Sequence, residues 1–184
     1  MAGGLGFTKS AARQETLVDN YSFKAEALAA AEQTEHRLIY VSPTLKEDVH
    51  ISGVARVKVR MAANKAAVNL SVYLVSLPWE DGRRTVITDN LITRGWADPQ
   101  NAKSGSLRKS EPLVDGEFVT VSFELNPDDQ IVRKGQQIGL MIMSSDKEFT
   151  LWPKPGAELT VELSETEVTI PVVGGMEALK KAME

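Results

Sequence analysis

The chain has 184 residues, a formal net charge of -4 and no cysteine. This length suits one domain with a sizeable core, and the negative charge argues against a general attraction to nucleic acid or anionic lipid. The lack of cysteine excludes disulfides, thiol nucleophiles and thiolate metal sites. No run reaches the roughly 20 apolar residues of a membrane-spanning helix, so we expect neither a nucleic-acid nor a membrane partner.

The first 36 residues (1–36) are predicted to form an arm that packs on the rest of the chain. Its first 20 residues mix glycine, small and charged residues without a clear period, which is typical of an extended segment or a linker. Strong helix formers follow at residues 24–32. The narrow apolar stripe of Ala27, Leu28 and Ala31 predicts a short helix lying on the surface of a larger body.

Between residues 37 and 175 the apolar residues recur with period two, which is typical of β-strands. A turn at residues 64–65 is predicted to join two of these strands in a hairpin. A short helical tail is expected over residues 176–184. The predicted strands cover residues 38–41, 49–51, 57–61, 68–74, 87–96, 119–125, 137–145, 149–152, 159–163 and 168–172.

The run 137–145 differs from the other strands because it does not alternate. Ile138, Leu140 and Ile142 would enter the core, yet Gly139, Met141 and Met143 on the other face are also uncharged. Both faces should therefore be covered. We expect the second face to lie under the N-terminal segment or to form a docking face for another domain.

Short strands at regular spacing, without alternating helices, predict an all-β antiparallel sandwich. The long crossing loops favour a jelly roll over a simple meander. The resulting division is an N-terminal arm with a short helix (1–36), a jelly-roll β-sandwich (37–175) and a C-terminal tail (176–184).

The sequence gives little support for catalysis. Serine hydrolysis needs a nucleophile with a base in reach, usually a histidine. The chain has two histidines, His36 and His50, and no G-x-S-x-G elbow. We interpret both histidines as surface or packing residues and expect no catalytic residue and no cofactor in this chain.

Two further sets of residues are candidates for a site. Asp128 and Asp129 are weak candidate metal ligands, but no spaced calcium-loop motif surrounds them, and we favour a turn rich in Asn and Asp as their explanation. Trp79, Trp96 and Trp152 are candidate ligand or interface aromatics that could stack on a sugar. The interpretation that we favour is that they pack at sheet ends and interfaces, where a large ring buries area while its N–H finds a partner.

Six segments of the chain form a recognisable series. They are 37–45 (RLIYVSPTL), 48–53 (DVHISG), 91–96 (LITRGW), 111–113 (EPL), 123–125 (FEL) and 135–142 (GQQIGLMI). No single motif is diagnostic, but their order and spacing are specific. Together they resemble the C-terminal domain of X-Pro dipeptidyl-peptidases and related acyl hydrolases such as cocaine esterase, and the resemblance covers roughly residues 17–175.

The resemblance implies a galactose-binding-like jelly roll appended to an α/β-hydrolase domain that carries the Ser-His-Asp triad. None of the family's catalytic residues can be placed in this chain. The expected partner is the α/β-hydrolase catalytic domain of the same parent chain, whose activity would be dipeptidyl-peptidase or acyl-ester hydrolysis. The alternative is a standalone module that binds carbohydrate or associates with itself as a homo-oligomer. A cytoplasmic location is favoured if the chain is complete, and export stays open if a longer parent carries a signal.

Overall fold

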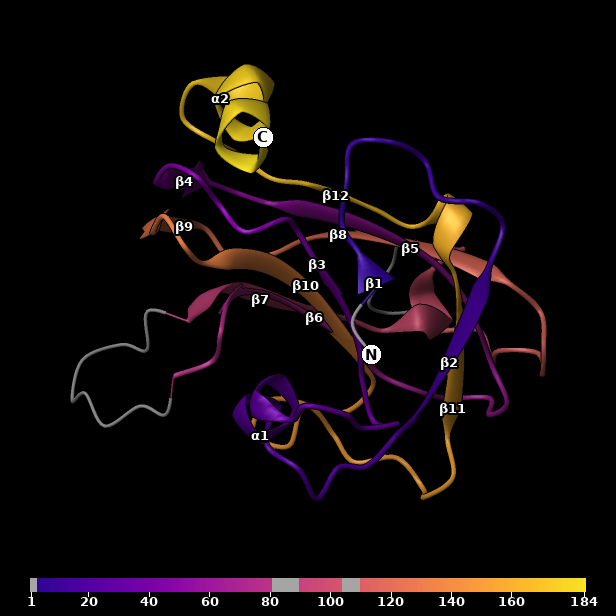
Figure 1. The fold of residues 1–184 in the computed structure, drawn as a ribbon. Helices are drawn as coiled ribbons and strands as arrows, with labels where there is room; N and C mark the ends of the chain where they lie inside the picture. Colours follow the sequence, from indigo (N-terminus) through magenta and orange to yellow (C-terminus); the bar gives the residue numbers. More distant parts are fainter. Residues whose placement is uncertain (1–2, 81–89, 104–109) are drawn as a thin grey trace.

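The computed structural model describes residues 3–80, 90–103 and 110–184 and shows two β-sheets facing each other (Figure 1). Sheet A has the strand order β1 (Gly3–Gly4), β3 (Leu38–Val41), β10 (Gln137–Met143), β6 (Leu70–Leu77) and β7 (Leu91–Ala97). Sheet B contains β12 (Glu167–Thr169), β5 (Arg56–Ala63), β11 (Glu158–Glu162) and β2 (Gln14–Val18), with β8 (Val119–Glu124) on the other edge of β5.

A third, two-stranded sheet pairs β4 (Val49–Gly53) with β9 (Asp128–Val132). The α-helices are α1 (Ala25–Ala30) and α2 (Gly175–Met183), and single 3₁₀ turns lie at Pro99–Asn101 (η1) and Leu163–Glu165 (η2). Except for the parallel pair β1–β3, the pairings between strands are antiparallel. The predicted all-β sandwich, with a short N-terminal helix and a helical tail, is confirmed. The jelly-roll connectivity stays a prediction.

The main core lies between sheets A and B. Alternate residues of β5 and β10, among them Val59, Met61, Leu140 and Ile142, are at most 3% exposed and belong to one continuous apolar cluster. The alternation places every second side chain on the inner face, so the sequence period predicts this layer correctly.

The outer face of sheet A is also buried. Met141 and Met143 on β10 are 0% and 1% exposed, because Leu28 and two alanines of α1 pack over them in a second apolar cluster. Gly139 allows close packing here, since a Cβ on it would lie 3.0 Å from Cγ2 of Val75. The N-terminal segment is thus the cover of this face within the chain.

The predicted hairpin at residues 64–65 is wrong. β5 pairs with strands of sheet B, whereas β6 pairs with β10 and β7 of sheet A, so the chain crosses between the sheets here. In the sequence of β6, the apolar residues Leu70, Val72 and Leu74 alternate with Ser71 and Tyr73. Both residues are buried because the outer face of sheet A is covered.

Three local predictions also need correction. Residues 149–152 form no strand, and β9 and β2 were not predicted. The predicted stripe of α1 is shifted, since its buried residues are Ala25, Leu28 and Ala29. Residues 87–89 of the predicted strand 87–96 lie outside the described residues.

The first 36 residues do more than pack on the sandwich. They supply β1 to sheet A and β2 to sheet B, and Leu17 of β2 is completely buried. The division into an arm (1–36), a sandwich (37–175) and a tail (176–184) stays a prediction.

The burial of the outer face makes a prediction about stability. Replacing Met141 with alanine should lower the free energy of unfolding by about 2–5 kcal/mol, since it leaves a cavity under α1. Leu151→Ala is the control, because Leu151 is 88% exposed and a surface truncation should change stability by no more than about 0.5 kcal/mol. Urea unfolding of both variants measures the difference, and equal midpoints would contradict the packing of α1 on β10.

Candidate interaction surface

The loop that follows β10 is held by a buried polar cluster. Ser145 is 2% exposed, and its backbone N–H and hydroxyl both donate to the carboxylate of Asp19, at 2.7 and 3.0 Å. Asp19 itself is 7% exposed. Because buried polar groups need partners, these bonds tie the loop to the segment that precedes α1.

Asp146, the next residue, accepts hydrogen bonds from two strands, β6 and β7, and from the loop itself. Its Oδ2 accepts hydrogen bonds from the Tyr73 hydroxyl at 2.5 Å and from the Trp96 indole N–H at 2.9 Å. Its Oδ1 accepts from the backbone N–H of Glu148 at 3.3 Å. The carboxylate is 1% exposed, so these donors replace water around a buried charge.

Arg94 lies beside this carboxylate and is surrounded by aromatic rings. Its guanidinium carbon is 4.0 Å from the ring centre of Phe149, 5.5 Å from that of Trp96 and 5.8 Å from that of Tyr73. One Nη also donates to the Tyr73 hydroxyl at 3.4 Å. Cation–π contacts of this kind favour a guanidinium over other cations.

Two pKa values reflect these contacts. Burial raises the pKa of Tyr73, and the hydrogen bond to Asp146 adds to the effect. The hydrogen bond from Lys24, at 2.7 Å, lowers the pKa of Glu148, with a smaller contribution from the nearby charge of Arg94. At neutral pH the raised pKa favours the protonated hydroxyl of Tyr73, and the lowered pKa favours the ionised carboxylate of Glu148.

Large apolar side chains are exposed next to this cluster. Trp152 is 59% exposed and stacks on Tyr21, with ring centres 5.4 Å apart. Phe149, Leu151 and Phe23 are 49%, 88% and 42% exposed. We call Tyr21, Phe23, Phe149, Leu151 and Trp152 the aromatic surface. It combines the loop after β10 with the segment before α1, and Lys147 links them by donating to the Ser22 carbonyl at 3.1 Å.

The three tryptophans are not gathered at one place. Trp152 lies in the loop after β10, and its indole N–H donates to the Lys147 carbonyl of the same loop. Trp96 lies on β7 and donates to Asp146 of this loop. Trp79 packs at the other end of β6, beside the second apolar cluster. Since Trp96 faces Ser71 and Trp79 follows Leu77, about 20 Å of strand separates them. Their roles in binding stay predictions.

The candidate metal ligands lie elsewhere, at the start of β9. The turn predicted at Asp128 and Asp129 is wrong, because both residues pair with β4 as strand residues. Asp129 pairs with His50 across the β4–β9 sheet, and this hydrogen bond lowers the pKa of Asp129. Asp128 has one buried carboxylate oxygen without a hydrogen-bond partner in the structure. No group of three His, Cys, Asp or Glu side chains suited to a metal occurs among the described residues.

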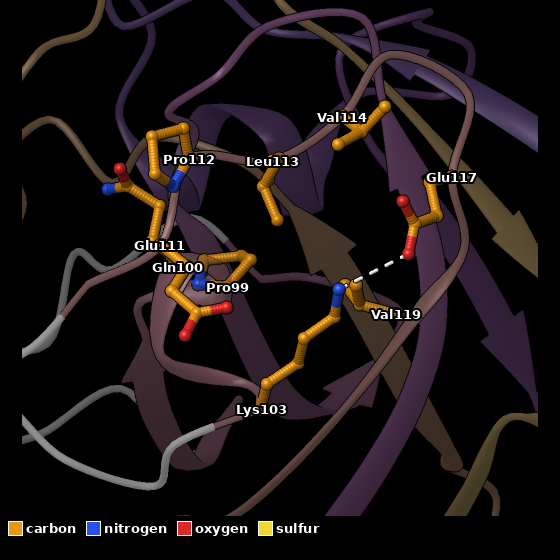
Figure 2. Close-up of a pocket in the computed structure, with 9 residues that line it drawn as sticks. All are labelled: Pro99, Gln100, Lys103, Glu111, Pro112, Leu113, Val114, Glu117 and Val119. Atoms are coloured by element: carbon orange, nitrogen blue, oxygen red, sulfur yellow. Dashed lines mark hydrogen bonds and ion pairs between the residues drawn. The ribbon is translucent and has the colours of Figure 1, made fainter.

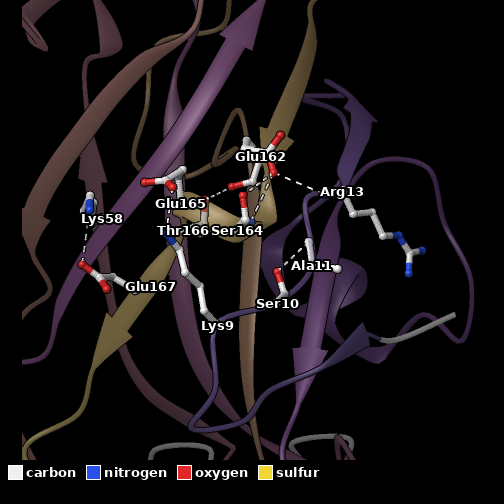
Figure 3. Close-up of polar contacts among 10 residues, drawn as sticks. All are labelled: Lys9, Ser10, Ala11, Arg13, Lys58, Glu162, Ser164, Glu165, Thr166 and Glu167. Atoms are coloured by element: carbon white, nitrogen blue, oxygen red, sulfur yellow. Dashed lines mark hydrogen bonds and ion pairs between the residues drawn. The ribbon is translucent and has the colours of Figure 1, made fainter.

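Two hollows of very different size lie among the described residues. The pocket in Figure 2, lined by Leu113, Lys103 and Glu117 among others, measures about 20 Å³, which is room for about one water. A groove of about 790 Å³ lies between the arm at residues 4–10, the segment 163–172 and α2. Its charged side chains pair with each other, Lys9 with Glu165 and Lys58 with Glu167 (Figure 3).

Sequence reasoning missed Arg94 and Phe149 as members of a site. A signal for Arg94 existed, because residues 94 and 96 of one strand share a face and so place a guanidinium beside an indole. The sequence held no such signal for Phe149, because its contact with Arg94 depends on how the loop after β10 folds back.

In the part of the chain that the structure covers, no helix is long and apolar enough to span a membrane.

The sequence of this chain is similar to one known protein family and to several curated proteins. The sequence model of the family described as "X-Pro dipeptidyl-peptidase C-terminal non-catalytic domain" matches residues 3–181. The "Putative Xaa-Pro dipeptidyl-peptidase" of Rhodopirellula baltica is 59% identical over 161 residues, which cover 88% of this chain and 25% of the relative. The protein of the same name from Bacillus anthracis is 36% identical, covering 86% and 25%. The chain spans about a quarter of the length of these curated relatives.

Solved structures resemble the fold at low sequence identity. An aminopeptidase from a marine sediment Thaumarchaeota archaeon superposes with a TM-score of 0.69 at 14% identity, over 93% of this chain and 35% of that chain. An α-amino acid ester hydrolase gives 0.65 at 15% identity, over 87% and 32%. A CocE/NonD family hydrolase from Staphylococcus aureus gives 0.62 at 14% identity, over 91% and 34%. These matches show a shared fold.

The buried tyrosines predict how stability changes at alkaline pH. Burial raises the pKa of Tyr73 and of Tyr40 above the usual value near 10. Below about pH 10 both folded and unfolded chains keep these protons. Above it the unfolded chain releases them first, so stability should fall as the pH rises towards the folded-state pKa.

Urea midpoints between pH 8 and pH 11 measure this decline. Tyr73→Phe should make it shallower, although the variant loses the hydrogen bond to Asp146 and starts from a lower stability. Tyr21→Phe is the control, because this ring stacks on Trp152 at the surface. A decline equally steep in Tyr73→Phe and in the unaltered chain would contradict the role given to Tyr73.

Proposed function

The chain belongs to the family of X-Pro dipeptidyl-peptidase C-terminal non-catalytic domains, and we propose that it acts as the accessory domain of a serine hydrolase. In this proposal it packs against an α/β-hydrolase catalytic domain and borders the active site there. The parent activity would be dipeptidyl-peptidase or acyl-ester hydrolysis, as the names of its relatives suggest.

The observation that carries the proposal is the family match over residues 3–181 together with relatives of which the matched part makes up 25%. A domain that accompanies a catalytic domain needs a surface for it. The aromatic surface has the required composition, because several large apolar side chains of the same loop and of the segment before α1 are exposed, and exposed apolar groups of this kind mark sites of protein interaction. Trp and Tyr are also enriched among the residues that contribute most to binding.

The position of this surface refines the docking face expected at Gly139, Met141 and Met143. Met141 and Met143 lie on the outer face of sheet A in one apolar cluster with α1. Gly139 faces side chains of the sheet itself, Val75, Leu77 and Ile39. A partner on this side would therefore meet α1 and the loop after β10 rather than the strand. We propose the aromatic surface as the contact and the residues of β10 as its support.

Carbohydrate binding and self-association are the alternatives for the same side chains. Trp152 offers a ring that is 59% exposed and already stacked on Tyr21, an arrangement that could extend to a sugar or to a second copy. Two results would favour these alternatives over docking. One is binding of this chain to a glycan array that Trp152→Ala abolishes. The other is a dimer, detected by light scattering, that dissociates in Trp152→Ala.

The docking proposal predicts a complex between separated parts. The portion of the Rhodopirellula baltica relative outside the matched region would be expressed alone and titrated with this chain in a calorimeter. We expect binding, and Trp152→Ala should weaken it at least about tenfold because an exposed aromatic anchor is lost. Met176→Ala, which truncates a 62% exposed side chain on α2, should leave the affinity unchanged.

Two results would contradict the proposal. The first is a failure of the separated parts to associate although each is folded. The second is hydrolysis of an X-Pro nitroanilide or an aryl ester by this chain alone, with labelling by a serine-reactive probe.

A further inference from the structure

Arg94 carries a positive charge whose hydrogen-bonding capacity is largely unused. A guanidinium has five N–H donors, and the bond to the Tyr73 hydroxyl, at 3.4 Å, engages one of them weakly. Among the described residues, no carboxylate lies within ion-pair distance of Arg94. Glu148 is near enough for Arg94 to lower its pKa, but it is bound by Lys24 at 2.7 Å.

The surroundings of Arg94 fix its position without neutralising it. Phe149 lies over the guanidinium, and Tyr73 and Trp96 flank it from the sheet. The two sheet residues are themselves held by their hydrogen bonds to the buried Asp146. A cation whose side chain is already ordered loses little entropy when it binds.

Asp146 does not form an ion pair with Arg94. Its oxygens already accept from Tyr73, Trp96 and the backbone of Glu148. The Tyr73 hydroxyl stands between the two charges, since it donates to Asp146 and accepts from Arg94. The remaining donors of Arg94 are thus available to a group that approaches from outside the sheet.

We propose that Arg94 receives an aspartate or glutamate side chain of the catalytic domain, beside Phe149 of the docked aromatic surface. This inference rests on the proposed function and names the chemistry of the partner. An arginine can bind a carboxylate through two parallel hydrogen bonds, and these charge-assisted bonds are stronger than neutral ones.

The aromatic surface favours a protein partner over a free carboxylate ligand. Phe149 forms one side of the Arg94 site and, together with Leu151 and Trp152, presents apolar area far larger than a small acid would cover. When a protein covers this area, water is excluded from the rim and the ion pair inside is strengthened. The partner surface should therefore present one carboxylate surrounded by apolar side chains.

The test uses the same two-part complex with variants of Arg94. Arg94→Gln keeps a polar side chain that can bond to Tyr73 but removes the charge, and it should raise the Kd about 30-fold or more. Arg94→Lys keeps the charge without the two-pronged geometry and should give an intermediate Kd. The affinity of the unaltered complex should also depend more steeply on salt concentration than that of Arg94→Gln.

Arg60→Gln is the matched control. Arg60 also lies over an aromatic ring, 5.6 Å from the centre of Phe118, but it belongs to β5 in sheet B. It should leave the Kd unchanged. Thermal unfolding of each variant separates a loss of binding from a loss of folding, and Arg94→Gln must be folded at the titration temperature for its Kd to count.

The outcomes separate this inference from the function it rests on. A complex that forms with the unaltered chain and with Arg94→Gln at equal affinity would overturn the role of Arg94 alone. The absence of any complex with the unaltered chain would overturn both proposals. Equal losses in Arg94→Gln and Arg60→Gln would show a general charge effect and would also overturn the site.

Discussion

The covering of both faces of sheet A is the constraint on which the rest of the structure depends. β6 and β10 carry apolar or small side chains on both sides, so an uncovered outer face would expose Met141, Tyr73 and Val75 to water. Burying a large apolar side chain contributes about 1.5–3 kcal/mol. The chain meets this requirement with α1 and the loop after β10, and both depend on polar contacts for their position.

The helix in this cover is too short to be stable alone. α1 has six residues, whereas isolated helices below about 12 residues are marginal in water. Arg37 compensates for this. Its side chain is 7% exposed and donates to the carbonyls of Leu28 and Ala31, at 2.8 and 2.5 Å. These bonds satisfy carbonyl groups at the end of the helix that would otherwise lack partners.

The sequence predicted the strands well and their pairing poorly, for a physical reason. Alternation is a local property, so β3, β5 and β8 could be placed from a few residues each. Pairing is a non-local property. The turn at residues 64–65 looked like a hairpin because two alternating runs flank it, but each run finds better partners in a different sheet.

The candidate site shows the same limit more strongly. The lack of alternation in β10 correctly predicted two covered faces, and it pointed to the side of the sheet where the aromatic surface lies. The Arg94 site needs side chains from β6, β7 and the loop after β10, which lie up to 76 positions apart in the sequence (Tyr73 to Phe149). No local period encodes such a meeting.

The cover of sheet A therefore has two roles if the domain docks as proposed. Its inner side completes the second apolar cluster, and its outer side carries the aromatic surface. Asp19 and Asp146 connect the two sides, because they hold the loop to the N-terminal segment and to the sheet. Docking on the outer side would then favour the folded cover, since any partner that binds only the folded form stabilises it by mass action. A non-catalytic domain of this design would gain stability from its catalytic neighbour through the same residues that recognise it.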